Sequence, residues 1–238
     1  MDYFYCAPEK FSKDSLLIDG DEYAHLVHVM RKKEGDEIRV VDGCGTAYDV
    51  RLGVLKKHMA HATILNILHS HNEPSLSVTL AIGVLKNPSK FDFLVEKVTE
   101  LGVKEIIPLT TKRTISKHAK VERWQKLALA AMKQCGRSYL PSIHKLTTLS
   151  DLLMRDDHFD YKMIAHEKSN NTMTINNALT KSNASVLILV GPEGGFDDEE
   201  FEECIRTGFN QMYFGERRLR TETAAIVATS FILMRTYF

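Results

Sequence analysis

Alternating polar and apolar residues mark the first part of the chain as mostly β-structure. Residues 36–41 alternate up to a glycine-rich turn at residues 42–45, and the alternation resumes over residues 46–55. Two such runs joined by a short turn predict a β-hairpin. Before it, the spacing of apolar residues predicts a short helix over residues 21–30.

The pattern changes at residues 69–75, a polar segment that contains Pro74. Polar residues combined with proline are typical of a connection between folded parts. We therefore predict two domains, residues 1–72 and residues 73–238.

Beyond this linker, short apolar runs alternate with segments of helical spacing. The clearest helix begins at Asn87, an N-cap residue followed by proline, and ends at Gly102. A second helical face runs over residues 121–135 and ends at Gly136. The predicted strands, each followed by a helical segment, are residues 76–84, 103–109, 161–165, 186–190 and 211–214. This repeated order implies a mainly parallel sheet with helices on both faces, an α/β fold.

Composition and charge exclude few functional classes of protein. The 238 residues carry 31 Lys and Arg against 31 Asp and Glu, so net charge alone does not indicate a nucleic-acid partner. Residues 86–145 form a basic band that can attract phosphate, although solvated helix faces explain it more simply. The four cysteines form no C-x-x-C pair, no signal peptide is apparent, and the apolar residues 224–238 are too few to span a bilayer. We expect a cytoplasmic protein with free thiols.

The apolar strand at residues 186–190 runs directly into the loop Gly191-Pro192-Glu193-Gly194-Gly195-Phe196. Ligands bind at the carboxyl ends of parallel strands, and glycines let a ligand lie against the main chain. The next helix begins with four carboxylates, residues 197–200, which would repel a phosphate, and the G-x-G-x-x-G spacing is absent. A nucleotide without phosphate therefore fits better than NAD or ATP. A plain tight turn is an equally good explanation of this string taken alone.

A second loop, residues 214–225, follows the last predicted strand and carries three arginines within four residues: Arg217, Arg218 and Arg220. Helix capping does not explain this cluster. The helix that follows, from Ala224, is almost wholly apolar, so the sheet, a partner or both must cover it. We infer a homodimer interface there.

Capping residues are available at the start of this last helix. Thr221 or Thr223 can cap it, and Glu222 suits its first turn.

Together the two loops resemble those of the SPOUT methyltransferases, whose C-terminal chain threads a trefoil knot. The resemblance narrows to the RsmE family of ribosomal small-subunit RNA uridine-N3 methyltransferases. It is carried by Gly-Pro-Glu-Gly-Gly-Phe at residues 191–196, Arg-x-Leu-Arg-Thr-Glu-Thr-Ala at 217–224, Lys-x-Thr-Glu-Leu-Gly-Val at 97–103, Glu-Arg-Trp at 122–124, Gln-x-Gly-Arg at 134–137 and a close match to His-Leu-x-x-Val-Leu-Arg at 25–31. These strings keep the family's order over nearly the whole chain. Arg218 stands where an apolar residue is usual, so it stays open which arginine points inward.

The resemblance implies a C-terminal SPOUT α/β-knot methyltransferase domain and a small N-terminal PUA-like RNA-binding β-barrel. It also implies that a homodimer moves the methyl group of S-adenosyl-L-methionine to N3 of a uridine in 16S rRNA of the small ribosomal subunit, without a metal. N3 must lose its proton, and the resulting charge spreads to O2 and O4. An arginine beside these oxygens would stabilise that charge.

The resemblance also implies roles for individual residues. Arg220 is the expected stabiliser of the uridine oxygens, and Glu222 either accepts the proton or, as we slightly favour, caps the helix. The predicted cofactor-binding residues are Ala165, His166, Val190, Gly191, Pro192, Glu193, Gly194, Gly195, Phe214, Gly215, Leu219, Arg220 and Thr221. The predicted RNA-binding residues are Arg31, Lys32, Lys33, Arg113, Gln134 and Arg137, with a surface salt bridge as the alternative for Arg113.

Two other functions stay open on the sequence alone. One is a related knotted methyltransferase that acts on tRNA or on a ribose 2′-hydroxyl. The other is an RNA-binding ribosome assembly factor that holds the cofactor without turnover. The pairs His25/His28 and His58/His61 have metal-ligand spacing but no third ligand nearby, so we expect no metal site.

Overall fold

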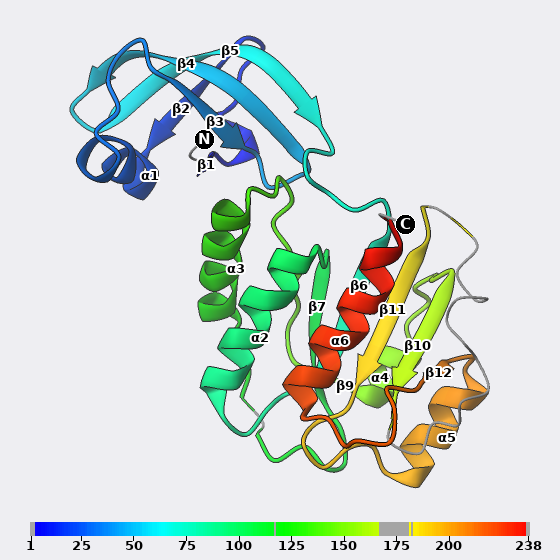
Figure 1. Cartoon of the computed structure of the whole chain (residues 1–238). Coiled ribbons are helices and arrows are strands. Elements are labelled where there is room, and N and C mark those ends of the chain that lie inside the picture. The colour runs from blue at the N-terminus through cyan, green and yellow to red at the C-terminus, as the bar shows by residue number, and fades with distance from the viewer. Residues whose placement is uncertain (1–2, 117, 167–180, 182, 237–238) are drawn as a thin grey trace. The chain divides into compact units, whose positions relative to one another are not determined.

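Two sheets organise the chain (Figure 1). The structure, a computed structural model, describes residues 3–116, 118–166, 181 and 183–236. They form two units: Met1–Glu73 with Leu129–Leu140, and Pro74–Ala128 with Pro141–Phe238. The predicted domain boundary lies one residue before the boundary between Glu73 and Pro74. Residues 129–140 were predicted to belong to the second domain but group with the first unit.

The sheet of the first unit has the strand order β1-β3-β4-β5-β2 and is antiparallel except for the β1–β3 pair. Its strands are β1 (Tyr3–Tyr5), β2 (Ser15–Asp19), β3 (Glu37–Val41), β4 (Thr46–Lys56) and β5 (Met59–His69). The predicted hairpin is confirmed as β3 and β4. Buried side chains such as Phe4, Ile18 and Leu26 form the core.

Helical turns complete this unit. The predicted helix over residues 21–30 is present as α1 (Gly20–Ala24), which continues into the π-helical turn η2 (His25–Val29). A short 3-10 turn, η1 (Pro8–Lys10), connects β1 to β2.

The segment 129–140 joins the first unit through packing and hydrogen bonds. Met132 forms a small buried cluster with Val41 and Ala47. The buried carboxylate of Glu73 pairs with Arg137 at 2.6 Å and accepts the main-chain N–H groups of residues 138 and 139 at 3.0 and 2.9 Å. Long-range contacts of this kind leave no local signal, so hydrophobic spacing could not predict them.

The sheet of the second unit is parallel throughout, as the βα order predicts, with the order β12-β10-β11-β6-β7-β8 and β9 beside β7. Its strands are β6 (Ser77–Gly83), β7 (Glu105–Thr110), β8 (Ser142–Ile143), β9 (Thr147–Thr148), β10 (Tyr161–Ala165), β11 (Ser185–Val190) and β12 (Asn210–Met212). The five predicted strands lie within two residues of the observed ones. The short strands β8 and β9 were not predicted.

Helices cover both faces of this sheet (Figure 1). They are α2 (Pro88–Leu101), α3 (Val121–Cys135), α4 (Leu149–Leu153), α5 (Asp198–Arg206) and α6 (Thr221–Leu233), which ends in the 3-10 turn η4 (Met234–Thr236). The predicted limits of α2 are confirmed: the Asn87 side chain accepts the N–H of Ser89, and Gly102 ends the helix with φ 114°. The helix expected after β10 falls outside the described residues, and α4 was not predicted.

The last helix returns from the edge of the sheet to its middle. It follows the edge strand β12, yet α6 packs against β6, β10, β11 and α2. This return is the path that the knotted fold requires. Of the described helices, none is long and apolar enough to cross a membrane.

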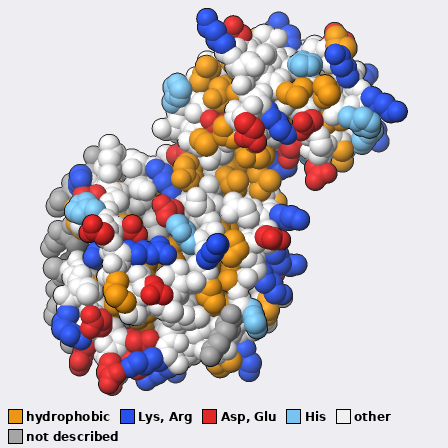
Figure 2. Space-filling view, turned by 180° about the vertical axis from the view of Figure 1, so that it is seen from behind, with side chains coloured by type: hydrophobic (Ala, Val, Ile, Leu, Met, Phe, Trp, Pro, Cys, Tyr) orange, Lys and Arg blue, Asp and Glu red, His pale blue; other side chains and the backbone are white. Residues whose placement is uncertain are grey.

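Ion pairs engage part of the predicted basic band. The basic side chains of residues 86–145 that form such pairs are Lys90, Lys97, Lys112, Arg123, Lys133, Arg137 and His144. Figure 2 shows basic and acidic side chains interspersed on the visible face. Acidic partners therefore weaken the attraction of this band for phosphate at long range.

Candidate active site

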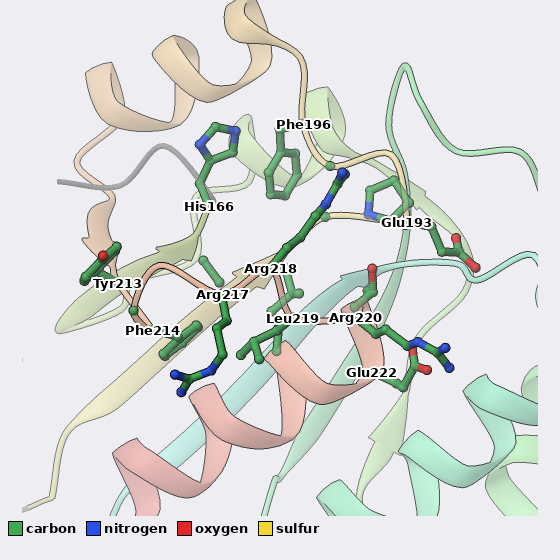
Figure 3. Close-up of a pocket in the computed structure, with 18 of the residues that line it drawn as sticks. His166, Glu193, Phe196, Tyr213, Phe214, Arg217, Arg218, Leu219, Arg220 and Glu222 are labelled. Atoms are coloured by element: carbon green, nitrogen blue, oxygen red, sulfur yellow. The ribbon is translucent and has the colours of Figure 1, made fainter. Parts of the chain in front are cut away.

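A cavity of about 760 Å³ lies at the carboxyl ends of the parallel strands (Figure 3). The strands β10, β11 and β12 bring Ala165, Val190 and Met212 to the same level of the sheet. The loops that leave them form the walls. The lining residues are Lys90, Ala165, His166, Val190, Gly191, Pro192, Glu193, Gly195, Phe196, residues 213–222 and Ala224.

The loop after β11 lines the cavity with main chain, as its glycines predict. A Cβ atom on Gly191 would come within 3.1 Å of the Gly195 main chain, and one on Gly83 within 2.4 Å of the Pro192 nitrogen. The distance at Gly83 is too short for any side chain, so glycine is required where β6 passes this loop. A Cβ on Gly191 would be a tight contact that needs a shift of a few tenths of an ångström in its neighbours. The Glu193 carboxylate accepts the main-chain N–H of Lys86 at 2.9 Å and ties the loop to the end of β6.

Gly194 is the one predicted cofactor residue that does not line the cavity. Its carbonyl accepts a hydrogen bond from Nη1 of Arg113 at 3.0 Å, and the Arg113 side chain covers its Cα. Arg113, which we predicted to contact RNA or to form a salt bridge, thus braces the glycine loop. Its side chain is exposed, so it also reaches the surface beside that loop.

Carboxylates occupy the start of the next helix, as predicted. Asp197 caps α5 by accepting the N–H of Glu200 at 2.8 Å, and Glu200 accepts the N–H of Asp197 at 3.0 Å. The amine of Lys112 pairs with Asp197 at 2.9 Å. The pKa of Asp197 is lowered by the Glu200 N–H and then by Lys112, so the helix start carries fixed negative charge. This arrangement disfavours phosphate there.

The three arginines of the loop after β12 point in different directions (Figure 3). Arg218 extends toward Phe196, Arg217 turns away from it, and Arg220 lies beside Glu222. All three line the cavity.

The start of α6 differs from the prediction. Arg220, not Thr221 or Thr223, occupies the N-cap position, and no side chain caps the helix there. Thr221 is already the first helical residue and is buried. The capping prediction was wrong because local preference for threonine yielded to the packing of this turn against the core.

Glu222 is held in the cavity wall by a residue that the sequence did not indicate. Its Oε1 pairs with Nζ of Lys90 from α2 at 2.9 Å, and its side chain is 12% exposed. Burial raises the pKa of Glu222, but the hydrogen bonds from Lys90 and from its own main-chain N–H, with the charges of Lys90 and Arg220, outweigh burial and lower it overall. Glu222 is therefore ionised at neutral pH.

His166 lies on the opposite wall of the cavity, beyond the end of β10. Its ring stacks on Phe201 of α5 at a centroid distance of 4.2 Å and an interplanar angle of 24°. This contact fixes the ring against the second helix layer. His166 and Ala165 both line the cavity, where they were predicted.

The predicted RNA-binding residues other than Arg113 belong to the first unit. Arg31 is exposed with φ 54°, Lys32 and Lys33 follow it in the same loop, and Gln134 is exposed. Arg137 is different, because its side chain is 3% exposed and paired with Glu73. The prediction of an RNA contact by Arg137 is corrected here: a guanidinium in a buried ion pair is a structural group.

Fold and site together define a class: an α/β-knot methyltransferase with an N-terminal RNA-binding unit. Residues 72–233 match the family model described as RNA methyltransferase domain, and residues 18–65 match the model described as RNA methyltransferase PUA domain. The chain belongs to this RNA methyltransferase family.

Relatives and solved structures agree with this assignment. The chain is 35% identical over 170 residues to ribosomal RNA small subunit methyltransferase E of Mesomycoplasma hyopneumoniae, covering 69% of this chain and 73% of that protein. It is 32% identical over 230 residues to the protein of the same name from Bacillus subtilis, covering 92% and 90%. The crystal structure of such a methyltransferase from Neisseria gonorrhoeae, bound to S-adenosyl methionine, superposes with a TM-score of 0.86 at 31% identity and covers 100% of this chain and 98% of that chain.

Proposed function

We propose that this protein transfers the methyl group of S-adenosyl-L-methionine to N3 of a specific uridine in 16S rRNA of the small ribosomal subunit. The observation that carries the proposal is the cavity at the strand ends, in which a main-chain cradle faces Arg220 and an ionised Glu222. The names of the relatives, which specify small-subunit ribosomal RNA, support the substrate class. The protein would act in the cytoplasm on RNA of the small subunit.

The cavity suits the proposed cofactor in size and in chemistry. Its volume of about 760 Å³ lies within the roughly 300–1,000 Å³ of small-molecule sites. Glycine at position 83 leaves room for main chain where a Cβ would clash, and glycine at position 191 avoids a tight contact with Gly195. The residues that would hold the adenosine and amino-acid parts are Ala165, His166, Val190, Gly191, Pro192, Glu193, Gly195, Phe214, Gly215, Leu219 and Thr221. When bound, S-adenosylmethionine supplies an activated methyl group on a positively charged sulfur.

Arg220 and Glu222 supply the groups that a uridine N3 requires. Hydrogen bonds from the Arg220 guanidinium to O2 or O4 stabilise the charge that develops when N3 loses its proton. The Glu222 carboxylate is ionised and accepts that proton; its lowered pKa makes it a weaker base, so the contact of Arg220 with O2 or O4 must also lower the pKa of N3. N3 lies on the Watson–Crick edge, so the target uridine must be unpaired or flipped out of its helix.

The RNA-binding assignment rests on exposed polar side chains of both units. Arg31, Lys32 and Lys33 would contact phosphates, as would Gln134. Arg113 sits at the glycine loop and would meet RNA that enters the cavity. These contacts act locally, because ion pairs engage part of the basic band.

A homodimer would cover the outer face of α6. Val227 and Phe231 of α6 are 36% and 43% exposed, and Met234 of the following turn η4 is 47% exposed, although α6 is the most apolar of the described helices. Apolar side chains at helical spacing on an exposed face are typical of a partner interface. Replacing Phe231 with Glu should convert the dimer to monomer in light scattering coupled to size exclusion, whereas Val54→Glu, at a more exposed apolar position in β4, should not. A wild-type monomer would contradict this part of the proposal.

Methyl transfer to purified ribosomal subunits tests the main proposal. Small subunits that lack the modification should accept labelled methyl, and nucleoside analysis should identify 3-methyluridine. The product should stop reverse transcription, because N3 methylation blocks pairing. Labelling of tRNA, or of a ribose hydroxyl, would support the related knotted enzymes instead, and binding without turnover would support an assembly factor.

The role of Arg220 is tested by substitution. Arg220→Ala should lower kcat by about 100- to 1000-fold, the usual cost of one stabilising donor, while cofactor affinity stays near that of the wild type. Arg206 of α5, which is exposed and is not among the residues that line the cavity, offers a matched control as Arg206→Ala. Equal loss of turnover and of cofactor binding in Arg220→Ala would assign Arg220 to the cofactor.

A further inference from the structure

We infer that Lys90 is a positioning residue, which holds Glu222 as an oriented carboxylate ion with one oxygen left for the substrate. The inference rests on the proposed function, because it assigns Glu222 as the acceptor of the uridine proton. It concerns a residue on α2, far in sequence from both loops that mark the site. Lys90 lines the cavity together with Glu222.

The two carboxylate oxygens of Glu222 differ in their hydrogen-bond partners. Oε1 receives the 2.9 Å ion pair from Lys90. Oε2 is buried and, among the residues that the structure describes, has no hydrogen-bond partner. A buried acceptor without a donor costs free energy, and in a cavity wall it marks a place for a donor of the ligand. The N–H at position 3 of uridine is such a donor.

Lys90 has the right chemistry to orient this carboxylate. It stands in the first turn of α2, where the Asn87 cap and Pro88 set the helix start, so its stem begins from a rigid element. Its side chain is 33% exposed and its amine carries three donors, one of which Glu222 uses. The chain therefore fixes Glu222 from α2 as well as from α6, and a turn of either helix alone would not hold it.

The charges around the pair determine what loss of Lys90 would do. The groups that line the same cavity are Lys90 from α2, His166 after β10, Glu193 from the glycine loop, and Tyr213, Glu216, Arg217, Arg218 and Arg220 from the last loop. Burial favours the neutral form of Glu222, and Lys90 opposes it first through its hydrogen bond and then through its charge. Without Lys90 the pKa of Glu222 should rise, since Arg220 is the remaining cation that acts on it.

The proton balance of the step is simple. The proton leaves N3 of uridine for the carboxylate of Glu222, and N3 keeps the electron pair with which it bonds the methyl carbon. The bond from that carbon to the sulfur of the donor would break, with its electron pair left on the sulfur of a neutral thioether. Glu222 then returns the proton to solvent. Lys90 keeps its own proton throughout and acts only through Glu222.

Three substitutions test the inference. Lys90→Met removes the charge and the hydrogen-bond donor, and Lys90→Arg keeps both. Lys97→Met is the matched control, because Lys97 lies on the same helix outside the cavity and also forms an ion pair with a glutamate, at 2.6 Å. Lys90→Met should lower kcat by about 10- to 100-fold at neutral pH, the cost of one hydrogen bond to a charged group, and shift the acid limb of the pH profile upward. Lys90→Arg should restore most of the activity. Lys90→Met should bind S-adenosylhomocysteine with the same affinity as Lys97→Met.

A second measurement does not depend on turnover. With glutamate labelled at its carboxyl carbon, NMR titration follows the Glu222 signal, which Glu222→Gln identifies by its loss. The pKa of Glu222 should be higher in Lys90→Met than in the wild type. An unchanged pKa, a Lys90→Met profile equal to that of Lys97→Met, or a loss of cofactor binding as large as the loss of kcat would each overturn the inference. If the wild type fails to methylate small subunits, the proposed function fails, and the titration still decides whether Lys90 controls Glu222.

Discussion

Gly83 offers a sharp test of the main-chain cradle. It ends β6, opposite the loop that follows β11. A Cβ atom at this position would lie 2.4 Å from the nitrogen, 2.6 Å from Cδ and 2.8 Å from Cα of Pro192. Backbone atoms and a rigid proline ring cannot rotate away, so Gly83→Ala must displace the glycine loop.

The size of the displacement follows from these distances. To restore an ordinary contact of 3.4 Å, the Pro192 nitrogen must retreat from 2.4 Å, a shift of about 1.0 Å. Misplacement by about 1 Å costs on the order of 100-fold in rate when binding and reacting groups must be aligned. Overpacking costs about 1–3 kcal/mol of stability, of which about 0.4–1 kcal/mol is offset by the smaller entropy of the unfolded chain.

Calorimetric titration with S-adenosylhomocysteine measures the effect on the cavity, and urea unfolding measures the effect on the fold. Gly53→Ala in β4 is the matched control, because its Cβ would meet the His61 carbonyl at 3.2 Å, within the other unit and away from the cavity. We expect weaker ligand binding in Gly83→Ala and unchanged binding in Gly53→Ala. Wild-type affinity in a folded Gly83→Ala protein would refute the idea that this loop forms the cradle.

Two further predictions concern stability. Glu73→Ala should destabilise the protein by about 3–5 kcal/mol in denaturant unfolding, because it removes the carboxylate from the buried ion pair with Arg137. Glu37→Ala, which breaks an exposed pair with Arg51, should cost only about 0–1 kcal/mol, and similar losses in the two variants would contradict the structural role of the Glu73–Arg137 pair. The pKa of Asp197 is lowered in the folded state, so ionised Asp197 stabilises the fold. This contribution to the free energy of unfolding is fully present above the ordinary pKa of 3.8 and is lost as the pH falls through the pKa of the folded state. Asp197→Asn should therefore flatten the dependence of Tm on pH in acid, and an unchanged acid profile would argue against the cap as a source of that dependence.

Much of the fold could be predicted because its signals are local. The Asn87-Pro88 start and Gly102 end of α2 depend on capping and on a left-handed residue, which neighbouring residues decide. The acidic start of α5 likewise follows from its own sequence. The Thr221 cap failed, because burial of that turn overrode the local preference of threonine.

The sequence by itself determined the order of strands and helices and the two loops that build the cavity, since periodicity and turn residues act over a few positions. Only the tertiary structure decided which side chains meet across the fold. The Lys90–Glu222 pair, the Arg113 brace on Gly194 and the burial of Arg137 against Glu73 each join residues from distant segments. Such pairs depend on which strands become neighbours and on which helix faces meet. Hydrophobic spacing along the sequence is a local signal and does not predict these long-range neighbours.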